Sequence, residues 1–132
     1  MAVPTPAELR DTAEAHWENA KILRDAGKYD GAVYLCGYAV EIALKARICQ
    51  VLNWPTFPPA GNEDFKSVFT HKIEPLLWFS GAVAEVKPKH LPDWAIIKRW
   101  DPELRYYPVG SKTAKDADET IMAAATLLKI LL

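Results

Sequence analysis

Residues 29–52 constrain the fold more than any other part of the chain, because at helical spacing they carry two different faces. When residues are placed at about 100° intervals, the small apolar side chains gather within roughly 60° of Ala32. These side chains are Leu35, Cys36, Ala39, Ala43 and Ala46. The opposite face carries Tyr34, Tyr38, Glu41 and Lys45. A helix with two such faces needs two partners, one of which is the core of its own subunit.

The mixed second face can be interpreted in two ways. Its aromatic and charged side chains suit an interface, and we expect Tyr34, Tyr38 and Glu41 to meet a second subunit, a ligand or another helix. Glu41 and Lys45 are also placed i and i+4 in the favourable order, so they could form only a surface ion pair worth about 0.3–0.5 kcal/mol. The sequence leaves both possibilities open.

The composition is that of one ordinary globular domain. Half of the 132 residues are hydrophobic and a quarter are charged, which is enough to bury a core without disulfides or metals. We predict a single domain over residues 1–132, with a Pro-rich loop over residues 53–69 inside it. No apolar run approaches the roughly 18 residues that a membrane span needs, and the N-terminal residues lack the features of a signal peptide. We therefore expect a cytoplasmic protein that does not bind membranes.

Capping signals and apolar periodicity predict the remaining elements. Thr5 to Glu8 form a capping box with proline at the first helical position, and no segment alternates strongly enough to be a strand. Besides 29–52, the predicted helices cover residues 5–27, 70–86 and 94–100, and a last one runs from Ser111 or Thr113 to residue 132. Because of Pro75, the regular part of the helix at 70–86 could begin only at Glu74. Residues 105–110 are expected to be an extended loop. Amphipathic helices joined mostly by short links bury their apolar stripes most simply as a bundle. We predict an all-α fold, an up-down four-helix bundle with an additional short helix.

Positive charge is concentrated in the second half of the chain. Residues 87–115 contain seven Lys and Arg but three Asp and Glu, whereas the whole chain has a net charge of −1. Such a segment is either a solvated basic surface or an anion site at one end of the fold. Within it, Arg105 and Tyr106 combine a guanidinium group with a ring on which a base could stack. The alternative for this pair is structural, with Arg105 bound to Glu41 and Tyr106 packed.

Common sequence signatures of catalysis are absent. The chain has no Gly-rich phosphate loop, no Cys-x-x-Cys, no His-x-x-x-His and no Gly-x-Ser-x-Gly motif, so we expect no metal site and no cofactor. His16 falls on the apolar stripe of the first helix, where a core or interface histidine is the simpler interpretation. His71 follows Thr70 at a helix start, where it could bind an anion or belong to a cap.

Three fragments, in this order, carry a resemblance to a known family. They are Ala-Gly-Lys-Tyr-Asp-Gly-Ala followed by Glu-x-x-Leu-Lys-Ala at residues 41–46, Thr-His-Lys-Ile-Glu-Pro-Leu-Leu at 70–77, and Arg-Tyr-Tyr-Pro at 105–108. Over roughly residues 7–131 the chain resembles the HEPN family. The resemblance implies a compact helical bundle that forms a homodimer. It also implies ties to RNA cleavage, to nucleotide binding, or to partnership with a small nucleotidyltransferase in toxin and antitoxin pairs.

The ribonuclease motif of the family is missing at its expected place. Ribonuclease members carry Arg, four to six residues and then His in a later helix, where the two side chains from two subunits meet on one RNA phosphate. Neither Arg99 nor Arg105 is followed by such a histidine. Arg10 and His16 have the spacing, but they lie about 120° apart around the first helix. Without an imidazole to move the 2′-hydroxyl proton, acid–base catalysis has no evident source, and the sequence disfavours an enzyme.

Three functional hypotheses remain. The first is a HEPN-like homodimer that binds a nucleotide or an RNA-like anion, and its expected ligand-binding residues are Lys45, His71, Arg99, Arg105 and Tyr106. The second is a protein-interaction module, such as one half of a toxin–antitoxin or nucleotidyltransferase pair, in which the second face of residues 29–52 only docks another protein. The third is a ribonuclease that uses His71 in place of the missing motif.

Overall fold

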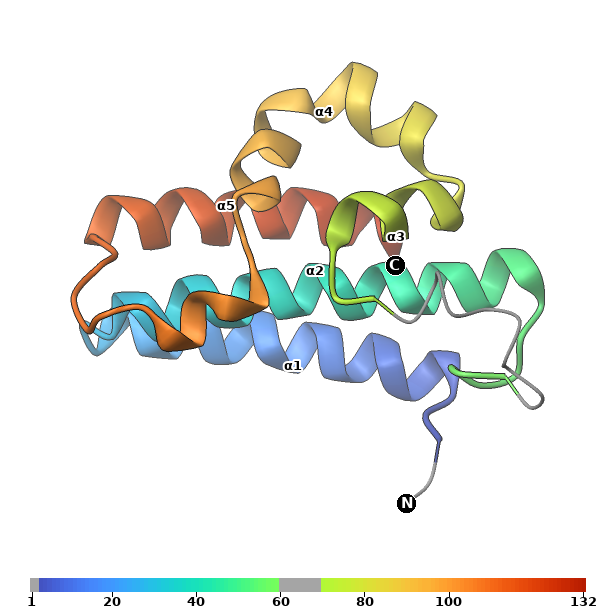
Figure 1. Cartoon of the computed structure of the whole chain (residues 1–132), viewed down its shortest axis with the longest axis horizontal. Coiled ribbons are helices and arrows are strands. Elements are labelled where there is room, and N and C mark those ends of the chain that lie inside the picture. Colours follow the sequence, from blue (N-terminus) through green and yellow to red (C-terminus); the bar gives the residue numbers. More distant parts are fainter. Residues whose placement is uncertain (1–2, 60–69) are drawn as a thin grey trace.

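The computed structural model describes residues 3–59 and 70–132, and in these ranges every regular element is a helix (Figure 1). The elements in chain order are α1 (Pro6–Asp25), α2 (Tyr29–Leu52), α3 (Ile73–Ser80), α4 (Val83–Lys98), a 3₁₀ helix η2 (Pro102–Tyr106) and α5 (Ala114–Leu131). The predicted all-α fold class is confirmed. The long helices α1, α2 and α5 pack against one another, while α3 packs on α2 and α4 packs on α5. Within the described ranges, each helix is too short or too polar to cross a membrane.

The middle helix, α2, is buried on nearly all sides. Its side chains without accessible surface are Cys36 and Leu44 together with Ala32, Ala39, Val40, Ala43 and Ile48. These residues cover about half of the helix circumference, so they extend well beyond the predicted apolar stripe. The helices α1, α3 and α5 pack along α2, and α4 and η2 also contact it. Both faces of α2 therefore find partners within one subunit.

Capping boxes start α1 and α5. The hydroxyl of Thr5 accepts a hydrogen bond from the N–H of Glu8 at 3.2 Å, and the carboxylate of Glu8 accepts one from the N–H of Thr5 at 3.1 Å. Thr113 and Asp116 form the same reciprocal pair at α5. The bonds from Thr5 and Thr113 lower the pKa of Glu8 and of Asp116, because they stabilise the ionised carboxylates. The predicted starts of α1 and α5 are thus confirmed.

The third predicted helix, over residues 70–86, is wrong at its end, whereas its start at Ile73 agrees within one residue with the later start that Pro75 allows. The helix α3 ends at Ser80 because Gly81 adopts a left-handed conformation, with φ of 74°, which glycine tolerates best. The next helix, α4, runs through residues 87–92, and the break that the sequence predicts there is present as a kink between two halves of α4. Its backbone leaves helical geometry at His90, with φ of −132° and ψ of 33°. Pro92 therefore stands in the first turn of the second half of α4, where its missing N–H needs no partner.

Trp100 joins the end of α4 to the middle of α2. Its indole Nε1 donates a hydrogen bond to the carbonyl oxygen of Tyr34 at 3.0 Å. The ring lies directly against Gly37, where an added Cβ would come within 2.0 Å of the indole. Glycine is therefore the residue that leaves room for this contact.

The helix η2 follows Trp100, so the predicted extended loop over residues 105–110 is wrong at its start. The carboxylate of Asp101 caps η2 by accepting a hydrogen bond from the N–H of Glu103 at 2.8 Å. Arg105 and Tyr106 are the last two residues of η2, which contacts α2.

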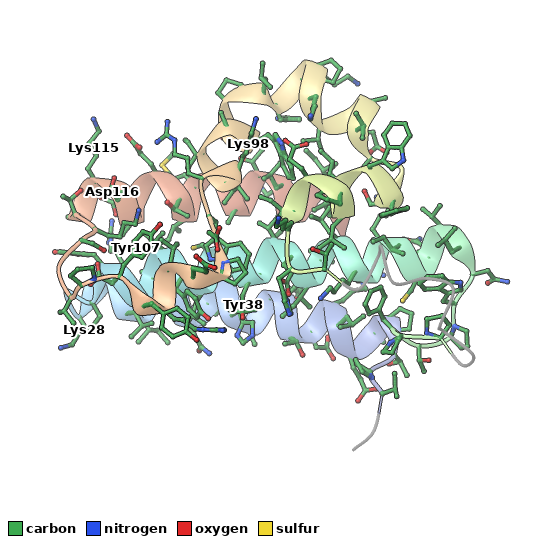
Figure 2. The ribbon with its side chains drawn as sticks, in the orientation of Figure 1. Lys28, Tyr38, Lys98, Tyr107, Lys115 and Asp116 are labelled. Carbon is green, nitrogen blue, oxygen red and sulfur yellow. The ribbon has the colours of Figure 1, made fainter. Side chains whose placement is uncertain are left out.

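Asp30 attaches the start of α5 to the rest of the bundle. Its two carboxylate oxygens accept hydrogen bonds from the N–H groups of Gly110, at 2.6 Å, and of Lys112, at 2.8 Å. These bonds hold the chain just before α5 against the first turn of α2. Figure 2 accordingly shows Lys28 and Lys115 at the same end of the bundle.

Gly37→Ala should destabilise the fold, because its methyl group would overlap the Trp100 ring. Overpacking of this kind costs about 1–3 kcal/mol. Gly31→Ala is the matched control on the same helix, since an added Cβ there would meet only the end of the Leu23 side chain, at 3.2 Å. Its expected effect is neutral, or stabilising by up to about 1 kcal/mol through helix propensity. Urea unfolding measures both, and equal free energies of unfolding for the two variants would contradict the Trp100 contact.

Candidate functional site

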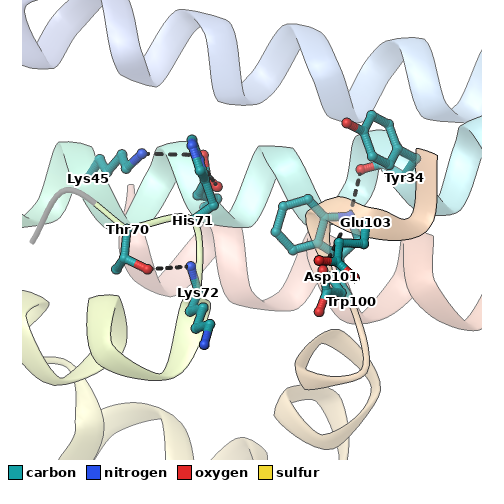
Figure 3. Close-up of polar contacts among 9 residues, drawn as sticks. Tyr34, Lys45, Thr70, His71, Lys72, Trp100, Asp101 and Glu103 are labelled. Atoms are coloured by element: carbon teal, nitrogen blue, oxygen red, sulfur yellow. Dashed lines mark hydrogen bonds and ion pairs between the residues drawn. The ribbon is translucent and has the colours of Figure 1, made fainter. Parts of the chain in front are cut away.

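Glu41 places a carboxylate inside the molecule, with 2% of its surface exposed. Lys45, one turn along α2, brings its Nζ to 3.4 Å from Glu41 Oε2, and His71 brings its Nδ1 to 3.0 Å from Oε1. Each oxygen thus has a partner, as a buried carboxylate requires. The i, i+4 pair considered from the sequence is present, but it is buried rather than on the surface. Figure 3 shows Lys45 and His71 side by side over α2.

A short turn before α3 presents His71 to Glu41. The hydroxyl of Thr70 accepts a hydrogen bond from the N–H of Lys72 at 3.0 Å, and α3 begins at Ile73. The side chain of His71 remains 62% exposed. Its ring therefore links the buried carboxylate to the molecular surface, and Nε2 forms no hydrogen bond with any described residue.

An aromatic cluster lies one turn before Glu41 on the same face of α2. The ring of Tyr38 meets the rings of Tyr34 and Trp100 edge to face, with 5.0 Å between centroids in each case, a geometry that aromatic quadrupoles favour. His16 of α1 adds a ring at 6.5 Å from Tyr38. The hydrogen bond with Tyr34, together with burial and the nearby charge of Glu41, raises the pKa of Tyr38 to about 12.

The residues expected at an interface, Tyr34, Tyr38 and Glu41, all make contacts within their own subunit. Glu41 is nearly inaccessible, whereas Tyr34 and Tyr38 keep partial exposure. Their internal contacts explain why the second face of α2 mixes aromatic and charged residues. A contact of the two tyrosines with a second subunit stays a prediction.

Arg105 and Tyr106 lie beside this cluster on the exposed side of η2. The guanidinium carbon of Arg105 is 4.9 Å from the centroid of the Tyr106 ring, a cation–π distance. Hydrogen bonds to the side chains of Tyr106 and Tyr34 raise the pKa of Arg105. The alternative in which Arg105 pairs with Glu41 is wrong, because Glu41 is bound to Lys45 and His71.

Arg99 lies in a different place, although it directly precedes Trp100. It lines a small cavity of about 40 Å³ together with residues of α4 and α5, among them Asp116. In the described part of the chain, no ion pair or hydrogen bond joins Arg99 to the other expected ligand-binding residues. The structure thus arranges these residues in three groups: Lys45 with His71, Arg105 with Tyr106, and Arg99 apart.

Trp100 and His16, which the sequence analysis does not assign to the site, both contact Tyr38. In the sequence, Gly37 is the feature that could have indicated the Trp100 contact, since a glycine inside a helix often marks a close approach by another group. Burial lowers the pKa of His16, in keeping with its interpretation as an internal histidine. Arg10, at the family's spacing from His16, bonds instead to the end of α5.

The chain matches one known domain family over its first two helices. Residues 7–55 match the model of the HEPN domain. The predicted resemblance to the HEPN family is confirmed over this range, which includes Glu41 and Lys45. His71, Arg105 and Tyr106 follow the matched HEPN segment in the sequence. No curated protein and no solved structure matches the chain significantly.

Lys45→Ala should destabilise the protein, because it leaves Oε2 of Glu41 buried without a cation. The side chains of Lys45 and Glu41 are 13% and 3% exposed, and a buried group that loses its partner costs about 1–3 kcal/mol. Replacing both residues by leucine should recover most of that loss, since no buried charge then remains.

His71→Ala is the control for this prediction. Because His71 is largely exposed, its contact with Glu41 should contribute less than about 1 kcal/mol. Urea unfolding at neutral pH compares the variants. If Lys45→Ala loses no more stability than His71→Ala, the buried pair does not stabilise the fold as described.

Proposed function

We propose that this chain binds a phosphate-containing ligand, a nucleotide or a stretch of RNA, on the surface formed by η2 and the adjoining face of α2. The observation that carries the proposal is the environment of Arg105. Its guanidinium group is exposed and held by the side chains of Tyr106 and Tyr34, and in residues 3–59 and 70–132 it forms no ion pair with a carboxylate. Arg105 is therefore held in position without being neutralised, and phosphate oxygens suit the fork of its N–H groups.

Exposed rings beside Arg105 support a ligand that carries a base. Tyr106 is 74% exposed and Tyr107, which follows η2, is 51% exposed. Rings of this kind stack on the bases of single-stranded nucleic acids with little sequence preference. A phosphate on Arg105 and a base on one of these tyrosines would together account for the composition of this surface.

The contacts of Glu41 determine whether a ligand can reach Lys45 or His71. Lys45 forms an ion pair with the buried carboxylate and is itself mostly buried, whereas His71 is largely exposed. The two partners on α2, Tyr34 for Arg105 and Glu41 for His71, lie about 10 Å apart along the helix axis. A ligand that contacts both Arg105 and His71 is therefore larger than a single phosphate, which favours a nucleotide or an oligonucleotide.

Calorimetric titration with AMP, ATP and a short single-stranded RNA tests this proposal. Arg105→Ala should weaken binding by about 10–100-fold, the loss expected for a hydrogen bond to a charged group. Arg105→Lys keeps the charge but not the planar fork and should retain part of the affinity. Lys89→Ala, an exposed lysine of α4, is the charge-matched control and should bind like the unmodified protein. Absence of binding at millimolar ligand, or an equal loss in Lys89→Ala, would overturn the proposal.

A second candidate function is RNA cleavage with His71 as the proton-transfer group. The observation that favours it is the 3.0 Å contact between Nδ1 of His71 and Oε1 of Glu41. A carboxylate on one ring nitrogen is how catalytic histidines are commonly oriented, with the other nitrogen left for the substrate. Arg105, on the same side of α2, would then stabilise charge on the phosphate. This arrangement would stand in for the Arg and His motif that the chain lacks.

Incubation of a labelled single-stranded RNA with the purified protein tests this second candidate. His71→Ala should lower the cleavage rate by about 100–10,000-fold. Glu41→Gln keeps the imidazole but removes the carboxylate that orients it and pairs with Lys45, and it should lower the rate less. Circular dichroism checks that each variant is folded. RNA that stays intact removes the candidate, and so does cleavage that His71→Ala leaves unchanged.

Partnership with another protein, such as the nucleotidyltransferase of a toxin–antitoxin pair, is the remaining hypothesis. It would use the exposed tyrosines of this surface and would not require Arg105 to bind phosphate. Nucleotide or RNA binding that Arg105→Ala weakens would show that such a partnership is not the sole function.

A further inference from the structure

A cavity of about 360 Å³ lies at the end of the bundle, where the turn between α1 and α2 meets the chain before α5. We call it the turn cavity. Its walls come from two segments that are distant in the sequence, residues 27–31 and residues 109–112. Its volume is at the lower end of the range for small-molecule sites, about 300–1,000 Å³. The turn cavity does not include any of the ligand-binding residues considered so far.

Positive charge prevails in the turn cavity. Lys28 comes from one segment and Lys112 from the other, against one carboxylate, that of Asp30. Both oxygens of Asp30 already accept hydrogen bonds from backbone N–H groups. Lys112 also acts on the charge of Asp116, but Thr113 binds that carboxylate. Neither lysine forms an ion pair with a described residue, so both ammonium groups are available to a phosphate.

One face of α2 connects the turn cavity with the proposed ligand surface. Asp30, Tyr34 and Glu41 follow one another on this face at steps of four and seven residues. Such steps place the three side chains within about 40° of one another around the helix. They extend over about 16 Å of its length. The three residues thus form a single row along α2.

Each member of this row holds a segment that is distant in the sequence. The first binds the backbone N–H of Lys112 at 2.8 Å. The second holds the guanidinium group of Arg105 by a hydrogen bond between side chains. The third lies 3.0 Å from the imidazole of His71. The turn cavity, Arg105 and His71 are therefore met in this order along one face of α2.

Exposed side chains cover the interval between Arg105 and the turn cavity. Tyr107, two residues after Arg105, is half exposed, and Val109 at the edge of the cavity is fully exposed. Along the long axis of the molecule, Figure 2 shows Tyr107 between Lys28 at the end of the bundle and Tyr38 nearer its middle. A strand that runs from Arg105 toward the cavity thus meets a ring for a base before it reaches the lysines.

We infer that the turn cavity binds a second phosphate of a single-stranded RNA, between the ammonium groups of Lys28 and Lys112. The inference rests on the proposed function and narrows its ligand to an oligonucleotide that lies lengthwise on α2. One phosphate lies at Arg105 and another in the turn cavity. A nucleoside monophosphate cannot fill both places, because it has a single phosphate. A charged path interrupted by rings is the usual construction of sites for single strands.

Calorimetric titration with AMP and with a single-stranded RNA of eight nucleotides tests the turn cavity. The RNA should bind at least about tenfold more tightly than AMP, because it makes the additional contact. Replacing Lys28 and Lys112 together by alanine should weaken RNA binding by about tenfold. The slope of log K against log salt should become shallower by about 0.7, since one phosphate contact is lost. The loss for AMP should be much smaller.

Lys89→Ala combined with Lys129→Ala is the matched control, since it removes the same charge from α4 and α5. Neither of these exposed lysines lines the turn cavity. The control should change the affinity for RNA far less than the variant of Lys28 and Lys112. Alanine at position 112 keeps the backbone N–H that Asp30 binds, so the variant should stay folded, which circular dichroism checks.

Val109 provides a second pair of variants at the edge of the turn cavity. Its side chain is fully exposed, so substitution there should leave the fold intact. Val109→Asp places a negative charge beside the inferred phosphate and should weaken RNA binding through repulsion between like charges. Val109→Asn has the same size without the charge and should bind more tightly than Val109→Asp.

Two results would overturn the turn cavity as a phosphate site while the proposed function stands. One is an RNA that binds no more tightly than AMP, with both weakened by Arg105→Ala. The other is RNA binding that the variant of Lys28 and Lys112 leaves unchanged, or that the control lowers equally. Absence of binding of AMP and of RNA would overturn the proposed function itself and this inference with it.

Discussion

The burial of α2 on nearly all sides is the constraint on which the other features depend. The buried polar groups of such a helix must be satisfied from within the subunit, and α2 carries Glu41 at 2% exposure. Lys45 from the same helix and His71 from the start of the α3 segment meet that requirement. Gly37 leaves room for the Trp100 ring to pack directly against α2. In this way two segments that are distant in the sequence are both attached to one face of α2.

The same attachments determine the electrostatics of the candidate site. Glu41 neutralises Lys45, which leaves that lysine with a structural role, while phenol side chains hold Arg105 and leave its charge intact. Two cations that look equivalent in the sequence therefore differ in what they can bind. The buried carboxylate also orients His71, whose exposed ring lies on the same side of α2 as Arg105. The candidate ligand surface is thus a consequence of how the second face of α2 is covered.

Features that depend on neighbouring residues were predictable, and features that depend on distant ones were not. The starts of α1 and α5 follow from Thr5 and Thr113, whose capping partners lie three residues away. The contact between Glu41 and Lys45 follows from i, i+4 spacing, but the contact between Glu41 and His71 joins residues 30 positions apart. The sequence prediction misses the end of α3, because Gly81 breaks the helix there. Pro88 and Pro92 do not end α4, because they lie on either side of a kink at His90.

The sequence by itself determined the all-α class, the extent of the long helices and the apolar stripe of α2, because periodicity and capping are properties of residues within one or two turns of each other. The tertiary structure decided that the second face of α2 is also covered, that Lys45 is neutralised and that Arg105 is not. The physical reason is that a side chain's burial and net charge depend on the groups brought against it from elsewhere in the chain, and local spacing carries no information about those groups.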